Sequence, residues 1–305
     1  MKVTVTGATG FIGGHVVRAL LERGDEVIAT GRSAARIAKV LGAGVQAVEW
    51  DAVQGPPPAE AVDGVDGIVN LAGENVAKGR WSRKKKNRIR DSRIIGTRHL
   101  VQGIAAAEHK PKVLVQGSAI GFYGDRQHQA IHETSPPAND FLGQVCVDWE
   151  AEAAKARALD VRVAMARTGI VLGKEDGAYP RLSRPFRMFL GAPIGAGRRW
   201  MSWIHIDDEV GILLHLLDTD ACDGAYNLTA PNPSPNAEFS YTLASVLKRP
   251  CIAIAGLPLP FVLPLALGEF AKVLLASQRI LPQRTVASGY EFKYPELRPA
   301  LENLR

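Results

Sequence analysis

The sequence predicts an α/β fold, in which a doubly wound parallel sheet is followed by a smaller C-terminal lobe. Short apolar segments alternate with helix-length segments over residues 1–168, a rhythm typical of parallel sheets covered by helices on both faces. The chain has 305 residues, of which 46% are hydrophobic and 22% charged. That length allows one large domain with a small lobe, and that composition is typical of a globular protein with a sizeable core.

The first strand is expected at residues 2–6, and a glycine-rich turn leads from it into an amphipathic helix expected at residues 14–23. Gly7 permits a backbone conformation that other residues avoid, Gly10 lets the chain approach a ligand, and Gly13 allows the helix to pack closely on the strand. N–H groups at the start of such a helix attract phosphates. The strand, turn and helix together predict a dinucleotide-binding turn of the Rossmann type.

Five further strands are predicted along the same part of the chain. They cover residues 26–30, 45–50, 67–71, 113–116 and 161–166. Because the carboxyl ends of parallel strands meet at one edge of the sheet, the residues that follow the strands are expected to border one crevice. These residues are Gly7, Gly31, Asp51, Ala72 and Ser118.

The end of the second strand indicates which dinucleotide binds. Gly31 stands where an NAD site usually places an acid on the ribose 2′-hydroxyl, and Arg32 and Ser33 follow it. Space and positive charge at this point favour a 2′-phosphate, so the predicted cofactor is NADP(H). The alternative is that Arg32 lies on a solvated turn. Asp51 follows the third strand and either approaches the adenine or is an exposed loop acid.

The domain prediction follows from these patterns. We expect an NADP(H)-binding Rossmann core at residues 1–168 and a mixed substrate lobe at 169–305, with some core elements around 203–228 and a small C-terminal domain at about 250–305. The predicted cofactor-binding residues are Gly7, Thr9, Gly10, Phe11, Ile12, Gly13, Arg32, Ser33, Asp51, Leu71, Ala72, Gly73 and Glu74.

Several classes of site are not supported. Cys146, Cys222 and Cys251 lie far apart without metal-ligand spacing, which favours reduced thiols and no metal site. A strand that begins at residue 2 leaves no room for a secretion signal, so a cytoplasmic protein is expected. The apolar stretch Ile252 to Leu267 is short and broken by prolines, so no membrane span or membrane partner is expected.

The net charge of +6 is concentrated in one segment. Residues 78–98 hold ten basic residues against one acid, Asp91. The run from Arg83 to Arg88 is expected to face solvent at a helix start, and the alternative is that it binds an acidic substrate or partner. No aromatic residue lies within the run from Arg83 to Arg88, so nucleic-acid binding by this run is disfavoured. Binding of nucleic acid there would depend steeply on salt concentration. The long helices expected after residues 81 and 140 are compatible with a monomer or a homodimer.

Several motifs carry a resemblance to a known superfamily. Asn70-Leu71-Ala72-Gly73, residues 117–124 and residues 203–208 resemble the extended short-chain dehydrogenases/reductases, the group of sugar-nucleotide epimerases and dehydratases. Further stretches narrow the resemblance to epimerase-family proteins of unknown substrate that carry a C-terminal domain of unknown function. These stretches are residues 70–75, 80–81, 92–94, 148–150, 167–173, 200–205 and 289–292.

The sequence departs from this family at the catalytic positions. The resemblance implies a Tyr-x-x-x-Lys pair followed four residues later by a glutamate, and a Ser or Thr four residues before Tyr-Gly. Counting back from Glu150 places Cys146 at the lysine position and Leu142 at the tyrosine position. Counting back from Tyr123 places Ala119 at the hydroxyl position. The usual proton transfer is therefore not expected here.

Three residues are the candidate replacements. Tyr123 and Ser118 carry hydroxyls near the end of the fifth strand that either polarise a substrate carbonyl or only shape the pocket. Arg93 lies on the helical stripe expected to turn inward, where it either grips a phosphate or carboxylate or forms an internal ion pair. Glu74 is a candidate base or the partner of Arg93, and Cys146 is taken as structural because apolar neighbours raise a thiol pKa.

The sequence thus predicts an NADP(H)-dependent oxidoreductase or epimerase-like enzyme that acts on a small molecule, which is anionic if Arg93 grips it. The alternative is a catalytically inert NADPH-binding sensor or scaffold protein. Loss of the usual Tyr, Lys and Ser/Thr together is what that alternative predicts.

Overall fold

The computed structural model of the chain describes residues 1–252 and 275–305. Most of the apolar stretch Ile252 to Leu267 and part of the predicted C-terminal domain at 250–305 lie outside the described residues. Within the described part, no helix is both long and apolar enough to cross a membrane.

A parallel sheet of seven strands forms the centre of the fold, in the order β3-β2-β1-β4-β5-β7-β11. The strands of this sheet are β1 (Lys2–Thr6), β2 (Glu26–Gly31), β3 (Gln46–Glu49), β4 (Gly67–Asn70), β5 (Val113–Ala119), β7 (Arg162–Thr168) and β11 (Gly224–Leu228). The predicted doubly wound α/β fold is therefore confirmed. The order reverses between β1 and β4, and ligands of such sheets bind outside the carboxyl ends at that point.

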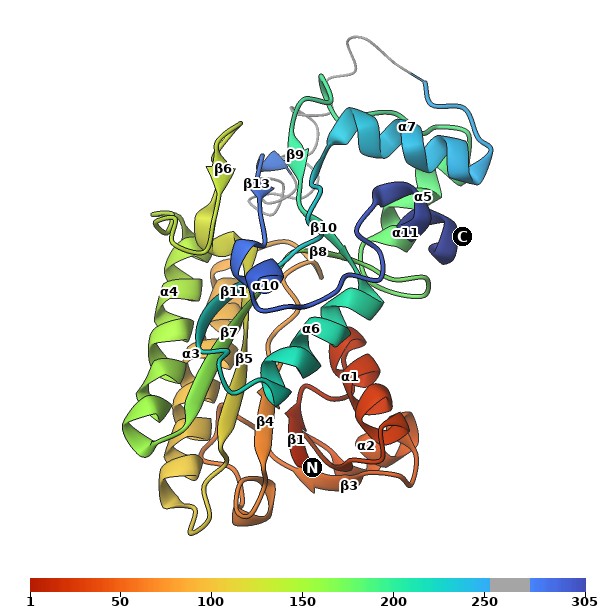
Figure 1. Cartoon of the computed structure of the whole chain (residues 1–305). Coiled ribbons are helices and arrows are strands. Elements are labelled where there is room, and N and C mark those ends of the chain that lie inside the picture. The colour runs from red at the N-terminus through yellow and green to blue at the C-terminus, as the bar shows by residue number, and fades with distance from the viewer. Residues whose placement is uncertain (253–274) are drawn as a thin grey trace.

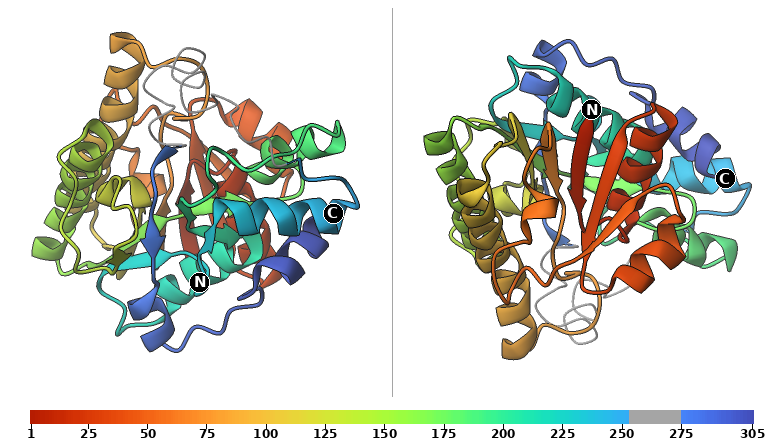
Figure 2. Two further views of the ribbon diagram at one scale, coloured as in Figure 1. Left: turned by 90° about the horizontal axis from the view of Figure 1, so that it is seen from above. Right: turned by 90° about the horizontal axis from the view of Figure 1, so that it is seen from below.

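Helices cover both faces of the sheet, as Figures 1 and 2 show, with α3 and α4 on one side and α1 on the other. The helices are α1 (Phe11–Glu22), α2 (Ala34–Leu41), α3 (Arg83–Ala106), α4 (Phe141–Ala154), α5 (Tyr179–Arg187), α6 (Ile206–Asp218), α7 (Asn236–Leu247), α10 (Gln283–Ala287) and α11 (Leu297–Leu304). Short 3₁₀ turns are η1 (Ala59–Ala61), η2 (Ile120–Tyr123) and η3 (Lys155–Leu159).

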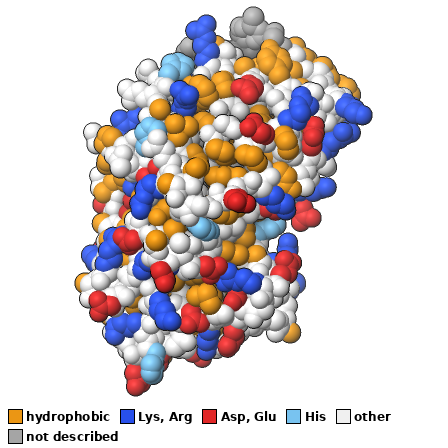
Figure 3. Space-filling model, viewed as in Figure 1, with side chains coloured by type: hydrophobic (Ala, Val, Ile, Leu, Met, Phe, Trp, Pro, Cys, Tyr) orange, Lys and Arg blue, Asp and Glu red, His pale blue; other side chains and the backbone are white. Residues whose placement is uncertain are grey.

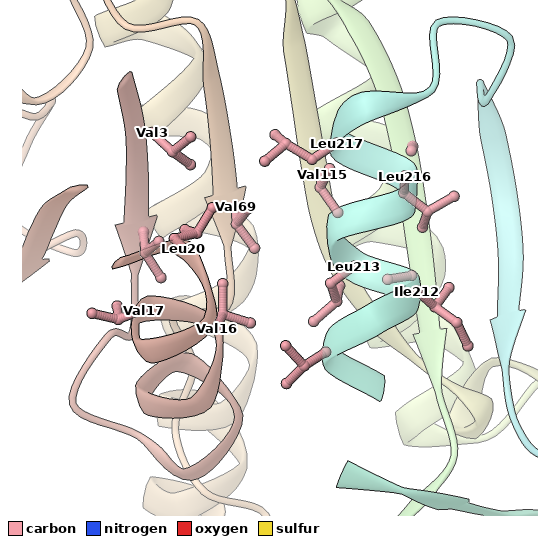
Figure 4. Packing of buried hydrophobic residues seen from close by; sticks show 14 of the residues in the cluster. Val3, Val16, Val17, Leu20, Val69, Val115, Ile212, Leu213, Leu216 and Leu217 are labelled. Carbon is pink, nitrogen blue, oxygen red and sulfur yellow. The ribbon is translucent and has the colours of Figure 1, made fainter. Parts of the chain in front are cut away.

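Helices α1 and α6 bury apolar stripes against the same face of the sheet (Figure 4). Val16, Val17 and Leu20 come from α1, and Ile212, Leu213 and Leu216 come from α6. Each set follows the three- and four-residue spacing of one helix face, so burial of apolar surface holds these helices in place. Helix α1 begins at Phe11, three residues before the predicted start, because the turn at Gly10 leads directly into helical backbone.

The C-terminal lobe packs α5, α7 and α11 around a second apolar cluster that includes Trp203, Phe239 and Leu301. Three short strand pairs lie outside the main sheet: β6 (Ala130–Ile131) with β13 (Arg279–Ile280), β8 (Ile170–Leu172) with β10 (Trp203–His205), and β9 (Trp200–Met201) with β12 (Ser234–Pro235). The first of these pairs joins the C-terminal segment to the part of the chain that follows β5. The last segment of the chain thus returns to residues near the carboxyl edge of the sheet.

Candidate functional site

The glycine-rich turn after β1 has no room for a side chain at two of its glycines. Gly7 has φ +67°, and a Cβ there would lie 2.8 Å from the carbonyl carbon of Leu71. A Cβ on Gly13 would lie 2.3 Å from the carbonyl oxygen of Gly7. These approaches hold the turn against the end of β4 and the start of α1 against the turn. The sequence predicts that a phosphate-bearing ligand approaches this backbone.

The N-terminus of α1 differs from those of three other helices. Ser33, Ser82 and Asp140 cap α2, α3 and α4 by accepting hydrogen bonds from backbone N–H groups. Gly10 begins α1 without a side-chain cap from any described residue, and the first turn carries no acid. Unpaired N–H groups and the positive end of the helix dipole favour an anion at this place.

Three of the predicted cofactor-binding residues follow β2 and β3, and they differ in their contacts within the protein. Arg32 is exposed and makes no hydrogen bond or ion pair with the described residues, although its charge helps to lower the pKa of Glu74. The hydroxyl of Ser33 accepts from the N–H of Arg36 and caps α2, so it already has a local role. Asp51 is half-buried, and its carboxylate accepts from the N–H of Val53.

The end of β4 is fixed by a hydroxyl from β1. Thr6 Oγ1 accepts from the N–H groups of Leu71 and Ala72, each at 3.1 Å, and donates to Asn70 Oδ1. The backbone after β4 therefore runs beside the glycine-rich turn. The structure thus brings together Gly7, Leu71 and Ala72, three of the residues predicted to bind the cofactor.

Glu74 lies in an ion pair. Its Oε1 accepts from Lys85 Nζ at 2.6 Å, and this hydrogen bond holds the pKa of the carboxyl below its ordinary value. Lys85, although it belongs to the run expected to face solvent, is buried and also donates to the Asn75 carbonyl. The expectation for the run is wrong at Lys85, because the carboxylate and the carbonyl compensate the buried ammonium group. An ionised, paired carboxylate is a poor general base.

Arg93 is the inward arginine that the sequence analysis singled out. Its Nη1 donates to the carbonyls of Glu74 and Ile89, each at 3.1 Å, and its guanidinium lies 5.0 Å from the ring centre of Trp149. It contacts the backbone of Glu74 and not its carboxylate. Among the described residues no acid pairs with Arg93, and burial lowers the pKa of its guanidinium. The expectation of an internal ion pair is therefore wrong for this part of the chain.

A buried polar network lies at the ends of β5 and β7. Arg167 donates through Nε and Nη2 to the two carboxylate oxygens of Glu150, each at 2.8 Å, and both side chains are almost fully buried. Ser118 Oγ donates to Glu150 Oε1 at 2.6 Å. Ser118 is thus held at the predicted edge of the sheet by an ion pair that the sequence did not reveal.

Tyr123 belongs to the same network and is fully buried. Its hydroxyl donates to Asn227 Oδ1 at 2.6 Å and accepts from Arg167 Nη1 at 2.9 Å. Burial raises the pKa of Tyr123 to about 12. Both its hydrogen-bonding directions are used within the protein, and at neutral pH the hydroxyl keeps its proton.

The sequence analysis matches Ala119, Leu142 and Cys146 to the family's catalytic positions. The Cys146 thiol lies 3.8 Å from the carbonyl oxygen of Ala119, and burial raises its pKa to about 12. Leu142 packs against Gly121, where a Cβ would meet its side chain at 3.3 Å. The thiol therefore stays neutral at physiological pH, in agreement with the expectation that Cys146 is structural.

Glu209 is a buried acid that the sequence analysis missed. Its Oε1 accepts from Thr168 Oγ1 at 2.7 Å, whereas its buried Oε2 has no partner among the described residues. Burial raises the pKa of Glu209 to about 8. Three successive acids at a helix start suggest solvent exposure, but Glu209 shares the spacing of the buried residues Ile212, Leu213 and Leu216. That shared spacing was the available signal.

Glu209 predicts a pH dependence of stability. In the unfolded chain a glutamate releases its proton near pH 4.5, whereas the folded protein keeps it to about pH 8. Between these two pH values the folded state binds more protons than the unfolded state. The contribution of Glu209 to the free energy of unfolding is therefore fully present below about pH 4.5, and it falls by on the order of 3 kcal/mol as the pH rises to 8. Urea unfolding at pH 5 and pH 8 should show this fall in the wild type and a smaller one in Glu209→Gln. An equal fall in both proteins would contradict the assignment.

Groups of possible metal ligands also occur in the described part of the chain. Asp63, Glu108 and His109 place one ligand atom each within 4.8 Å of one another. They lie outside the crevice, two of them are exposed, and clusters of this kind are common on protein surfaces. We assign no metal site to them.

Comparison with known proteins adds to this geometry. A family profile for the NAD-dependent epimerase/dehydratase family matches residues 3–229, and a profile for a domain of unknown function, DUF1731, matches residues 260–304. The epimerase family protein SDR39U1 homolog, chloroplastic, from Arabidopsis thaliana is 40% identical over 99% of this chain and 86% of its own length. The epimerase family protein YfhF from Bacillus subtilis is 36% identical over 100% of this chain and 98% of its own.

Solved structures of other proteins are also similar to this chain. The human epimerase family protein SDR39U1, crystallised with NADPH, superposes with a TM-score of 0.86 at 33% identity, covering 100% of this chain and 99% of that one. A UDP-glucuronic acid 4-epimerase from Bacillus cereus shares the fold at a TM-score of 0.77 and 16% identity, covering 99% and 97%. The NADP(H) prediction agrees with the ligand of the human protein. The chain belongs to the NAD-dependent epimerase/dehydratase family, in the branch whose members carry a C-terminal domain of unknown function.

Proposed function

We propose that this protein binds NADP(H) in the crevice between β1 and β4. Three observations support the cofactor: the glycine contacts at Gly7 and Gly13, the uncapped start of α1, and Arg32, which makes no hydrogen bond or ion pair with the described residues. Arg32 would meet the 2′-phosphate, and the N–H groups at the start of α1 would meet the pyrophosphate. The NADPH in the human relative's structure supports the same choice. When bound, NADPH supplies a hydride to a substrate carbon.

We further propose that the protein is an oxidoreductase or epimerase-like enzyme that lacks the usual Tyr-x-x-x-Lys pair. Leu142 has no ionisable group, and Cys146 is a neutral thiol. Ser118 donates its only hydroxyl proton to Glu150 in this structure, and it is proposed to polarise the reacting oxygen when that hydroxyl turns from Glu150 toward the substrate. Tyr123 is proposed as a positioning residue, because both its hydrogen bonds hold Asn227 and Arg167 in place.

The proposal about the substrate rests on the environment of Arg93. A partly buried guanidinium without an acid among the described residues costs stability, and its Nε and Nη2 make no hydrogen bond within them. A carboxylate or phosphate on the substrate would compensate the charge and satisfy these donors. We therefore propose a small substrate that bears an anionic group and a carbonyl, or the corresponding alcohol.

Replacing Arg93 with methionine tests this role. We expect NADPH oxidation with carboxylate- or phosphate-bearing carbonyl compounds to fall by at least about a hundredfold, because one charged, buried hydrogen-bonding group is lost. The melting temperature should be unchanged or higher, since an unpaired buried charge is removed. Steady-state kinetics and thermal unfolding provide the two readouts.

Arg162 is the matched control. It also donates only to backbone carbonyls, those of Leu216, Leu217 and Cys222, but two of them end α6 at the opposite edge of the sheet. Arg162→Met should lower the melting temperature and leave turnover per folded molecule unchanged. Equal turnover in Arg93→Met and the wild type would contradict the substrate proposal.

The second candidate function is an NADPH-binding sensor or scaffold without chemistry. The neutral Cys146 thiol and the fully bonded Tyr123 hydroxyl favour it, because neither is poised to move a proton. If NADPH raises the melting temperature but resists oxidation by a broad panel of carbonyls and quinones, this candidate replaces the enzyme proposal.

We also propose that the protein works in a reducing compartment such as the cytoplasm. Cys146, Cys222 and Cys251 are all free thiols. Buried free thiols are typical of proteins that are kept reduced.

A further inference from the structure

Three large apolar side chains project from the C-terminal end of α5. Met188, Phe189 and Leu190 are 56%, 55% and 66% exposed. Single exposed apolar residues are common, whereas three consecutive ones at a turn form a local apolar projection. We call Met188–Leu190 the α5 tip.

The backbone of the α5 tip is held in an unfavourable conformation. The Phe189 N–H donates to the Phe186 carbonyl at 2.9 Å and the Leu190 N–H donates to the Pro185 carbonyl at 2.8 Å, the two bonds of a Schellman helix end. The left-handed residue of that motif is usually glycine, but here it is Phe189, with φ +61°. A bulky residue in this conformation costs folding free energy, and such local conflicts concentrate at functional sites.

Positive charge surrounds the α5 tip. Residues 177–206 contain five arginines and no aspartate or glutamate. Arg181, Arg184 and Arg187 come from α5 and are exposed. Arg249, which follows α7, places its guanidinium 4.8 Å from the ring centre of Phe189. On the part of the molecule where Figure 1 places α7, Figure 3 shows Lys and Arg side chains together with hydrophobic, Asp and Glu side chains.

A small basic pocket lies on the same helix. Lys174, Arg184 and Arg187 line it together with Tyr179 and Ser183, and its volume is about 240 Å³, enough for a phosphate group. The three cations form no ion pair within residues 1–252 and 275–305. The buried hydroxyl of Tyr179 has no hydrogen-bond partner in that part of the chain.

We infer that the α5 tip docks on an anionic lipid surface, with its apolar side chains in the interfacial layer and Arg181, Arg184 and Arg187 on lipid phosphates. Charge complementarity selects this occupant, since a second copy of the chain would bring the same cations together and be repelled. An exposed apolar tip with arginines beside it suits the headgroup boundary of a bilayer. This is contact without a span, so it agrees with the helix lengths. It differs from the expectation of no membrane partner that was drawn from the sequence.

Vesicle binding tests the inference directly. Full-length protein should cosediment with vesicles of phosphatidylglycerol and phosphatidylcholine at low salt, and binding should weaken as salt rises because exposed charges are screened. Vesicles of phosphatidylcholine alone should bind at least tenfold more weakly. Failure to bind the anionic vesicles at low salt would overturn the inference.

Two variants separate the α5 tip from the general positive charge of the protein. Phe189→Gly suits the left-handed position, so the melting temperature should stay equal or rise while vesicle binding falls about tenfold through loss of the ring. Arg181→Gln, Arg184→Gln and Arg187→Gln combined should weaken binding roughly a hundredfold, since each basic residue near an anionic surface contributes about fivefold.

The control variant removes the same number of charges far from α5. Lys39→Gln, Lys110→Gln and Lys112→Gln combined should leave vesicle binding within about twofold, because these exposed lysines lie outside the docking surface. NADPH titration should be unchanged in all three proteins, which separates this inference from the proposed function. Equal losses in the control and the α5 variants, or full binding by Phe189→Gly, would overturn the inference.

Discussion

Replacing Gly13 with alanine should raise the Kd for NADPH by at least about a hundredfold. The new Cβ would lie 2.3 Å from the Gly7 carbonyl oxygen and 3.0 Å from Ala8 Cα, both backbone atoms that cannot move aside as a flexible side chain can. The turn and the start of α1 must therefore separate, and a displacement of about 1 Å at such a site costs on the order of a hundredfold in function. Fluorescence titration of NADPH measures the effect.

Gly14→Ala is the matched control, one residue further along α1. A Cβ there would lie 3.6 Å from the nearest atom outside its local helix backbone, an ordinary van der Waals contact. Alanine favours helix over glycine by up to about 1 kcal/mol, so this variant should be at least as stable as the wild type and bind NADPH unchanged. Equal NADPH affinity in the two variants would show that the glycine-rich turn is not the cofactor site.

Removing Glu150 should lower the free energy of unfolding by about 3–5 kcal/mol. Glu150→Ala leaves the Arg167 guanidinium buried without its carboxylate, and an uncompensated buried charge is strongly destabilising. Ser118 also loses its acceptor, so its hydroxyl is no longer held in position. Urea unfolding monitored by tryptophan fluorescence gives the change in stability.

Two further proteins make this prediction specific. The double variant Glu150→Leu with Arg167→Met removes both charges and should recover much of the lost stability. Glu302→Gln breaks the exposed ion pair with Arg298 and should have little effect. If the double variant is no more stable than Glu150→Ala, lost packing and not the unpaired charge explains the destabilisation.

The fold and the cofactor crevice were predictable from local pattern. Strand, glycine turn and helix follow one another within residues 2–22, so the conformation of Gly7 and the packing of Gly13 depend on near neighbours. The parallel order of the sheet follows from the alternation of strands and helices. The predicted start of α1 was less exact, because its N-cap is a glycine and provides no capping side chain that the sequence could reveal.

The polar groups of the site were not predictable in this way. Glu150 pairs with Arg167 on another element, and Lys85 reaches Glu74 across a loop, so each pairing depends on how distant segments pack. Arg93 was placed inward by its helical stripe, but whether an acid faces it depends on tertiary structure. Tyr123 was expected near the crevice, yet packing buries its hydroxyl between Asn227 and Arg167.

The most direct test of the central claim is titration of the wild-type protein with NADPH and NADH. Arg32 follows β2 and makes no hydrogen bond or ion pair with the described residues, and Gly31 leaves no acid at that point. NADPH should therefore bind at least tenfold more tightly than NADH. Arg32→Ala should remove most of that difference by weakening NADPH alone. Equal affinity for the two dinucleotides, tighter binding of NADH, or no binding of either would contradict an NADP(H) site in this crevice.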